Sequence, residues 1–195
     1  NEQSLRVVDV LERDGKGLNL SYEVRMGIVG HTGPQIPETL EGQIVRHSDR
    51  IAYVNHDIDD AVRAGILTNE DIPKSIARIL GNTHSQRINT LVCDIIRTSA
   101  EARAICLTPE VEKALKDLRS FMFERVYRNP VAKGEESKAR DMLQWLYRYY
   151  TEHPEALPQD FQPQLSFDGM GRTVCDYIAG MTDNYAVDKF TQLFT

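Results

Sequence analysis

The chain has 195 residues, of which 41% are hydrophobic and 27% are charged, and its formal net charge at pH 7 is −6. This composition allows a packed core and does not indicate disorder. The negative charge argues against sequence-independent binding of duplex nucleic acid, which needs a basic face, although a local basic pocket is compatible with it.

Three scattered cysteines cannot form a disulfide framework or a zinc cluster, and their odd number favours a reducing, cytoplasmic location. No apolar run approaches the roughly 20 residues that span a bilayer, so we expect no membrane partner. The chain starts at Asn1 without an initiator methionine, and we expect its natural N-terminus to lie upstream.

Apolar residues recur at helical spacing almost throughout, and no segment alternates with a period of two, so the sequence predicts an all-α fold. A first helix should end at residues 14–17, and a second should cover 18–29 behind a cap at Asn19 or Ser21. A rigid loop at 33–37 precedes a long helix over about 38–64. Further helices are predicted at about 70–80, 84–104, 108–128, 135–152 and 170–194, with a break at 129–136 and a proline-containing loop at 154–172.

The long helix carries a polar stripe. At about 100° per residue, Asp49, Tyr53 and Asp57 fall on one face, and His56 and Asp60 join them. The other side is apolar, with Leu40, Ile44, Ile51, Ile58 and Val62. A solvated face on an amphipathic helix is one interpretation. Against it, carboxylates one turn apart repel each other, which is tolerable when a cation or a sugar hydroxyl lies between them.

Residues 49–60 read Asp-Arg-Ile-Ala-Tyr-Val-Asn-His-Asp-Ile-Asp-Asp, and this segment resembles a motif of bacterial dGTP triphosphohydrolases and their relatives. The two flanking segments, 39–45 and 61–67, agree with the same family. So do three segments further away, 1–7, 121–127 and 174–183. The chain is therefore similar to the C-terminal portion of an HD-domain deoxynucleoside triphosphate triphosphohydrolase. This resemblance implies an HD-domain helical bundle, with the C-terminal part of the HD-type core at 1–128 and a helical extension packed on it at 129–195.

The resemblance also implies roles for a metal ligand and two arginines. Asp49 would give an oxygen ligand to a divalent metal ion, whose identity the sequence does not distinguish among Mg, Mn, Fe and Zn. Arg50 and Arg119 would contact the triphosphate, because the guanidinium fork matches phosphate oxygens. A surface salt bridge is the alternative for Arg50.

Three more residues match positions around the deoxyribose. Tyr53 and Asp57 would hold the sugar, with Asp57 accepting a hydrogen bond from the 3′-hydroxyl. Tyr127 would pack near C2′ and exclude a ribose hydroxyl, and its spacing from Arg119 on a predicted helix places both on one face. For both tyrosines, a place in the hydrophobic core is the alternative.

His56 and Asp57 form a His-Asp dipeptide that, with His31, imitates the metal-binding set of this family. The surrounding motif decides against it, because in the family this segment follows the metal-binding pair. A lone His, a His-Asp pair and a catalytic His would all lie upstream of Asn1. We therefore expect the chain to supply one metal ligand of four, to contain no assigned catalytic residue and to be inactive alone.

The family's reaction is hydrolysis of a dNTP to deoxynucleoside and inorganic triphosphate. We expect a divalent metal as cofactor, a dNTP as substrate and further copies of the chain as partners in a homo-oligomer. Two alternatives stay open: another HD-domain nucleotide phosphohydrolase, and a non-catalytic regulatory helical module that keeps the fold without the metal.

Overall fold

The computed structural model describes the backbone of residues 1–195 and all side chains except those of 131–133 and 135. Its regular elements are helices, with no strand among the described residues, which confirms the all-α prediction. The assignment of these helices to an HD-type bundle stays a prediction. The chain forms two compact units, Asn1–Asn129 and Pro130–Thr195, and each is described by itself.

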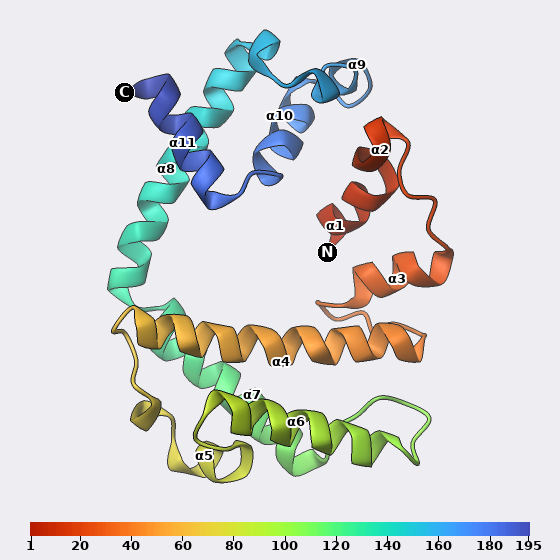
Figure 1. The fold of residues 1–195 in the computed structure, drawn as a ribbon, viewed down its shortest axis with the longest axis vertical. Helices are drawn as coiled ribbons and strands as arrows, with labels where there is room; N and C mark the ends of the chain where they lie inside the picture. The colour runs from red at the N-terminus through yellow and green to blue at the C-terminus, as the bar shows by residue number, and fades with distance from the viewer. The chain divides into compact units, whose positions relative to one another are not determined.

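In the first unit, α4 packs against α3 and, on another side, against α6 and α7 (Figure 1). The elements of this unit are α1 (Glu2–Arg6), a π-helical turn (Val7–Leu11), α2 (Glu12–Gly15), α3 (Tyr22–Gly30), α4 (Leu40–Arg63), a 3-10 turn (Asn69–Asp71), α5 (Lys74–Leu80), α6 (His84–Ser99), α7 (Pro109–Met122) and a second π-helical turn (Phe123–Tyr127).

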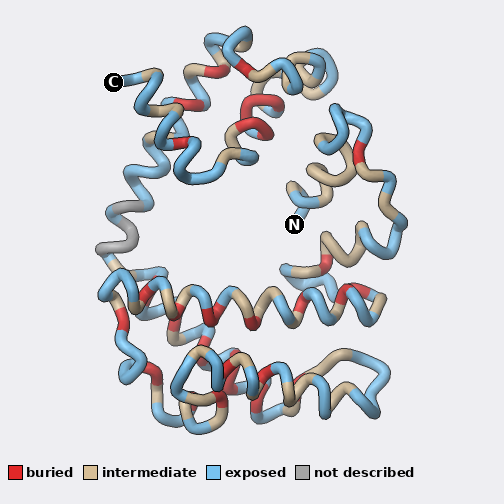
Figure 2. The backbone as a smooth tube through the Cα atoms, in the orientation of Figure 1, coloured by how far each residue is buried: buried red, intermediate tan, exposed pale blue. Residues whose placement is uncertain are grey.

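The core of this unit lies between the second half of α4 and helices α5 to α7 (Figure 2). Ile58 of α4, Leu91 of α6 and Leu118 of α7 are fully buried in it. The predicted apolar face of α4 is buried only in part, because Leu40 and Ile44 are 47% and 49% exposed. The second half of α4, whose apolar side is buried, is therefore the part that holds the polar stripe in a fixed position.

The first half of α4 is held by the loop that follows α3. Thr39 caps the helix by accepting a hydrogen bond from the Gly42 amide at 3.2 Å. A Cβ atom on Gly42 would lie 2.6 Å from Pro37 Cβ, and one on Gly30 would lie 2.8 Å from Pro37 Cγ. Two glycines thus let the loop approach the helix closely.

The second unit has its own core, around Leu146, Tyr150, Val174 and Tyr177. Its elements are α8 (Pro130–Glu152), 3-10 turns at Pro154–Ala156 and Gln159–Phe161, α9 (Gln164–Phe167), α10 (Met170–Ala179) and α11 (Asp183–Phe194). No described helix in either unit has the length and apolar character that a membrane span requires.

Several predicted boundaries are wrong. The predicted helix over 170–194 is two helices, because the Thr182 side chain accepts from the Tyr185 amide at 3.3 Å and starts α11. The predicted break at 129–136 exists but is shorter, since α8 already begins at Pro130, a residue favoured in the first helical turn. The second predicted helix begins at Tyr22 behind Ser21. Of the helices predicted over 84–104 and 108–128, the first ends early, at Ser99 (α6), and the second begins at Pro109 (α7).

Candidate functional site

The α4 helix directs three polar side chains of the predicted stripe into one cavity. Asp49, Tyr53 and Asp57 lie one turn apart, while Ile51 and Ile58 are buried on the opposite side of the helix. His56 and Asp60 were expected on the same stripe, but neither lines the cavity. The His56 ring instead stacks on that of His84, with centroids 6.0 Å apart and an interplanar angle of 22°. The His56-Asp57 dipeptide resembles a metal-binding pair in sequence, but only Asp57 of the two lines the cavity.

Helix α7 and the π-helical turn after it form the opposite wall. Leu118 and Met122 are buried, whereas Arg119 faces the cavity. The π-helical turn then brings Tyr127 to the same cavity. Turns of this kind are rare and occur frequently at functional sites, because they redirect a side chain relative to a regular helix.

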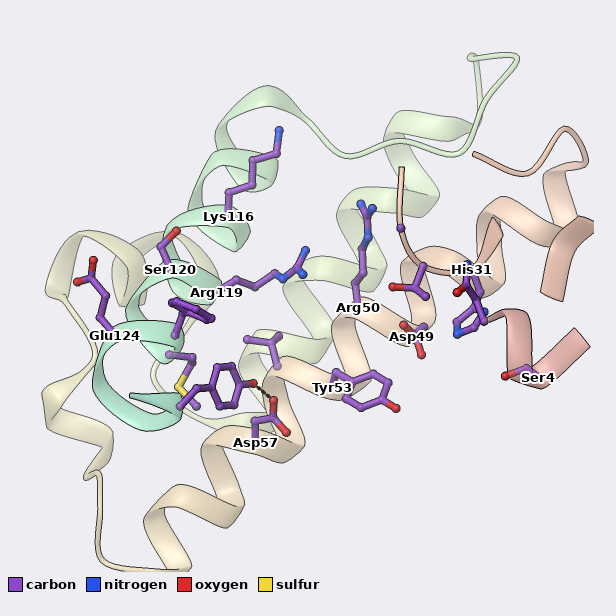
Figure 3. Close-up of a pocket in the computed structure, with 17 residues that line it drawn as sticks. Ser4, His31, Asp49, Arg50, Tyr53, Asp57, Lys116, Arg119, Ser120 and Glu124 are labelled. Atoms are coloured by element: carbon purple, nitrogen blue, oxygen red, sulfur yellow. Dashed lines mark hydrogen bonds between the residues drawn. The ribbon is translucent and has the colours of Figure 1, made fainter. Parts of the chain in front are cut away.

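Together these walls enclose a cavity of about 1070 Å³ in the first unit, which we call the α4–α7 pocket (Figure 3). All six residues that the sequence singled out line it: Asp49, Arg50, Tyr53, Asp57, Arg119 and Tyr127. Tyr53 is 64% exposed and Tyr127 is 46% exposed, so the alternative of a core aromatic is wrong for both. The roles of the six side chains stay predictions.

One hydrogen bond joins the two walls. The Tyr127 hydroxyl donates to the Asp57 carboxylate, a short contact across 70 positions of sequence (Figure 3). Burial, and next the nearby Asp60 carboxylate, raise the pKa of Asp57, while His56 lowers it. The bond orients the carboxylate toward the pocket while other acceptor positions of its oxygens stay available.

The two arginines of the pocket have no carboxylate partner in hydrogen-bond or ion-pair contact within the described part of the chain. Among the described residues, neither Arg50 nor Arg119 has a hydrogen bond or an ion pair to a carboxylate. Burial, and then the charges of Arg46 and Arg119, lower the pKa of Arg50. Two guanidinium groups that repel each other in a half-buried cavity favour an anionic ligand, since its charge would offset theirs.

The chain offers only part of a metal site. Asp49 presents a half-buried carboxylate to the pocket, and a carboxylate oxygen suits a hard divalent cation. No group of three or more His, Cys, Asp or Glu side chains among the described residues could hold a metal ion. The donor chemistry of Asp49 therefore fits a metal ligand, but the described residues offer no complete ligand set around it.

Sequence reasoning missed several pocket residues. Those with polar side chains are Asn1, Ser4, Thr32, Lys116, Ser120 and Glu124. His31 also lines the pocket, whereas the sequence analysis named it only in a set that was rejected. Lys116 and Ser120 lie three residues before and one after Arg119, so the same helical spacing could have found Lys116. His31 follows α3 in a loop, where no periodic pattern reports which way a side chain points.

Comparison with known proteins agrees with the resemblance seen in the sequence. Residues 105–192 match a phosphohydrolase-associated domain. Over 194 residues the chain is 46% identical to a deoxyguanosinetriphosphate triphosphohydrolase-like protein of Caldanaerobacter subterraneus subsp. tengcongensis, covering 100% of this chain and 57% of that protein. The chain is thus similar over its whole length to a protein with this description.

Proteins of the same description in Clostridium tetani and Geobacter metallireducens are 41% and 33% identical to this chain over its whole length. The chain spans 59% and 64% of their lengths, so it corresponds to about three fifths of these relatives. The matches support a phosphohydrolase family, and they are consistent with a C-terminal portion.

Proposed function

We propose that the chain forms the sugar and phosphate side of the active site of a metal-dependent phosphohydrolase that converts a dNTP to deoxynucleoside and inorganic triphosphate. The observation that carries this proposal is the convergence of six side chains on one cavity. They come from two helices that are distant in sequence, and the cavity combines unpaired guanidinium groups with a carboxylate and tyrosines. A solvated helix face would not require this convergence.

Arg50 and Arg119 would bind the triphosphate. Neither has a carboxylate partner among the described residues, so neither has to break an ion pair to bind phosphate. Their charges also offset negative charge that develops as the phosphate ester is cleaved. Lys116 also lines the pocket, but its ammonium group is paired with the Glu112 carboxylate at 2.8 Å.

Asp57, Tyr53 and Tyr127 would hold the deoxyribose. Asp57 accepts from Tyr127 and would accept from the 3′-hydroxyl with a remaining lone pair. Because Tyr127 is tied to Asp57, its ring has a fixed place beside the sugar. A ribose carries an additional 2′-hydroxyl, and a fixed aromatic ring there would exclude it by sterics.

Asp49 would hold a divalent metal ion with ligands from upstream residues of a longer protein, as the family resemblance implies. When bound, such an ion polarises a phosphate ester and activates water for attack. We accordingly expect residues 1–195 alone to release no triphosphate from any dNTP, while a full-length protein containing them releases it. Turnover by residues 1–195 would show that the missing ligands are not needed.

The phosphate part of the proposal can be tested without a metal. Inorganic triphosphate is titrated into residues 1–195 by calorimetry, for the unchanged chain and for Arg119→Ala. Loss of charged hydrogen bonds, at about 1.5–3 kcal/mol, should weaken binding by about ten- to a hundred-fold. Arg63→Ala is the matched control, because Arg63 is exposed, lies on α4 and does not line the pocket. Equal weakening in both variants would mean that binding reflects overall charge only.

The sugar part is tested by Tyr127→Ala. We expect the preference for dGTP over GTP, measured as the ratio of kcat/KM in the full-length protein, to fall because the steric barrier at C2′ is removed. Asp57→Asn should instead weaken use of both nucleotides, since each has a 3′-hydroxyl. An unchanged dGTP-to-GTP ratio in Tyr127→Ala would remove the sugar role of Tyr127.

A further inference from the structure

Phe123 is an exposed aromatic residue of the α4–α7 pocket to which the proposed function gives no role. It lines the pocket together with Arg119 and Tyr127, one turn before it and one turn after it in the sequence. The residue is 51% exposed, although its neighbours Met122 and Val126 are buried in the core. Covering an exposed phenyl ring with another apolar or planar surface is favourable, so this position favours contact with a ligand.

Two neighbours fix the orientation of the Phe123 ring. The Arg128 guanidinium lies over the ring, 5.0 Å from its centroid, in a cation–π contact. The Tyr127 ring meets it nearly at a right angle, with centroids 6.2 Å apart and an interplanar angle of 74°. Because Tyr127 is itself bonded to Asp57, the Phe123 ring is tied to the residues proposed to hold the sugar. A ring held in this way is preorganised for a planar ligand, since it has little freedom left to lose on binding.

The stereochemistry of a nucleotide indicates which part of it Phe123 meets. Phosphate is proposed to lie at Arg119 and the sugar at Asp57 and Tyr127, which leaves the base without a contact. In a deoxynucleotide the base and the 5′-carbon leave one face of the sugar ring, and the 3′-hydroxyl leaves the other. A sugar whose 3′-hydroxyl faces Asp57 therefore directs its base to the same side as its phosphates, where Phe123 follows Arg119 on the wall of the pocket.

We infer that Phe123 is the base-stacking residue of the α4–α7 pocket, and that the base of a deoxynucleotide lies flat on the ring face opposite the Arg128 guanidinium. The inference rests on the proposed function and names a contact that the proposed function does not assign. Every base has a π face, so stacking adds affinity for any base. Stacking does not read hydrogen-bonding groups, and Phe123 therefore does not by itself select one base over another.

Calorimetry without metal separates a contact with the base from a contact with phosphate. dGTP and inorganic triphosphate are each titrated into residues 1–195 with EDTA present, for the unchanged chain, Phe123→Leu and Phe123→Tyr. Leucine keeps apolar bulk but lacks a planar face, so Phe123→Leu should weaken dGTP binding by about five- to a hundred-fold. Binding of inorganic triphosphate should stay unchanged, and Phe123→Tyr should retain the affinity for dGTP. Phe167→Leu is the matched control, because Phe167 is 86% exposed and lies in the second unit.

Nuclear Overhauser effects report the contact itself. The chain has six phenylalanines, and the ring signals of Phe123 are those that disappear in Phe123→Tyr. With dGTP bound, we expect cross-peaks from the guanine H8 proton to the ring of Phe123 and not to the rings of the other phenylalanines. The inference is overturned if this cross-peak is missing, or if Phe123→Leu weakens dGTP binding no more than triphosphate binding. If Arg119→Ala still weakens triphosphate binding in that case, the phosphate part of the proposed function stands without it.

Discussion

At the residue scale, the pocket depends on pairings that link distant positions. Asp57 was predicted as a sugar ligand from the motif around it, and its bond to Tyr127 adds a partner 70 positions away. Such a bond cannot be predicted from periodicity, because periodicity reports only which side of its own helix a residue occupies. The same limit applies to His31, whose ring is oriented by a hydrogen bond between Nδ1 and the Ile28 carbonyl oxygen.

The raised pKa of Asp57 gives a prediction about pH. On acidification, the ionised carboxylate should be lost at a higher pH than that of an ordinary aspartate, because burial and then Asp60 favour the neutral form. Asp60→Asn should lower the pKa of Asp57, and His56→Ala should raise it. Following the Asp57 carboxyl ¹³C signal against pH measures both shifts, and shifts of the same sign in the two variants would contradict the electrostatic explanation.

At the element scale, α4 could be predicted from the sequence more completely than its neighbours. Its polar and apolar residues follow the helical period, and the predicted range of 38–64 contains the observed Leu40–Arg63. The π-helical turn at Phe123–Tyr127 was included in a regular helix over 108–128, because a local change in hydrogen bonding has no signature in residue spacing. The cap at Thr182 was a signal present in the sequence, and it was overlooked inside the apolar period of 170–194.

The unequal burial of α4 predicts unequal stability effects along one helix. Ile58 is fully buried and Ile44 is 49% exposed. Ile58→Ala should lower the free energy of unfolding by about 2–5 kcal/mol, since it leaves a cavity between α4 and its neighbours. Ile44→Ala should change it by less than about 1 kcal/mol. Urea denaturation compares the two, and equal losses would show that the first half of α4 is also packed.

The contact between α4 and the loop before it can be tested at Gly42. An added methyl group would lie 2.6 Å from Pro37, so Gly42→Ala should destabilise the first unit by about 1–3 kcal/mol. Gly134 is the matched control, because a Cβ atom there has no neighbour within 4 Å. Gly134→Ala in α8 should be neutral or stabilising by up to about 1 kcal/mol. Similar losses in both variants would mean that Pro37 yields without cost.

At the scale of the whole molecule, the all-α fold could be predicted because helical spacing persists along nearly the entire chain. The boundary between the two compact units lies between Asn129 and Pro130 in the sequence. The sequence alone does not reveal that each unit has a separate core, because apolar residues of both units follow the same period. That separation depends on which side chains meet, as Ile58 and Leu118 do in one core and Leu146 and Val174 in the other.

Two separate cores predict two separate responses to cavity-forming substitutions. Leu146 and Leu118 are both fully buried, one in each unit, and the two clusters share no residue. Each change to alanine should cost about 2–5 kcal/mol. Leu146→Ala should raise amide hydrogen exchange in α8 and α10, while exchange in α4 and α7 and the affinity for triphosphate stay unchanged. Leu118→Ala should give the opposite pattern and weaken triphosphate binding, because α7 carries Arg119. Raised exchange in both units from either substitution would mean that the chain unfolds as one cooperative body.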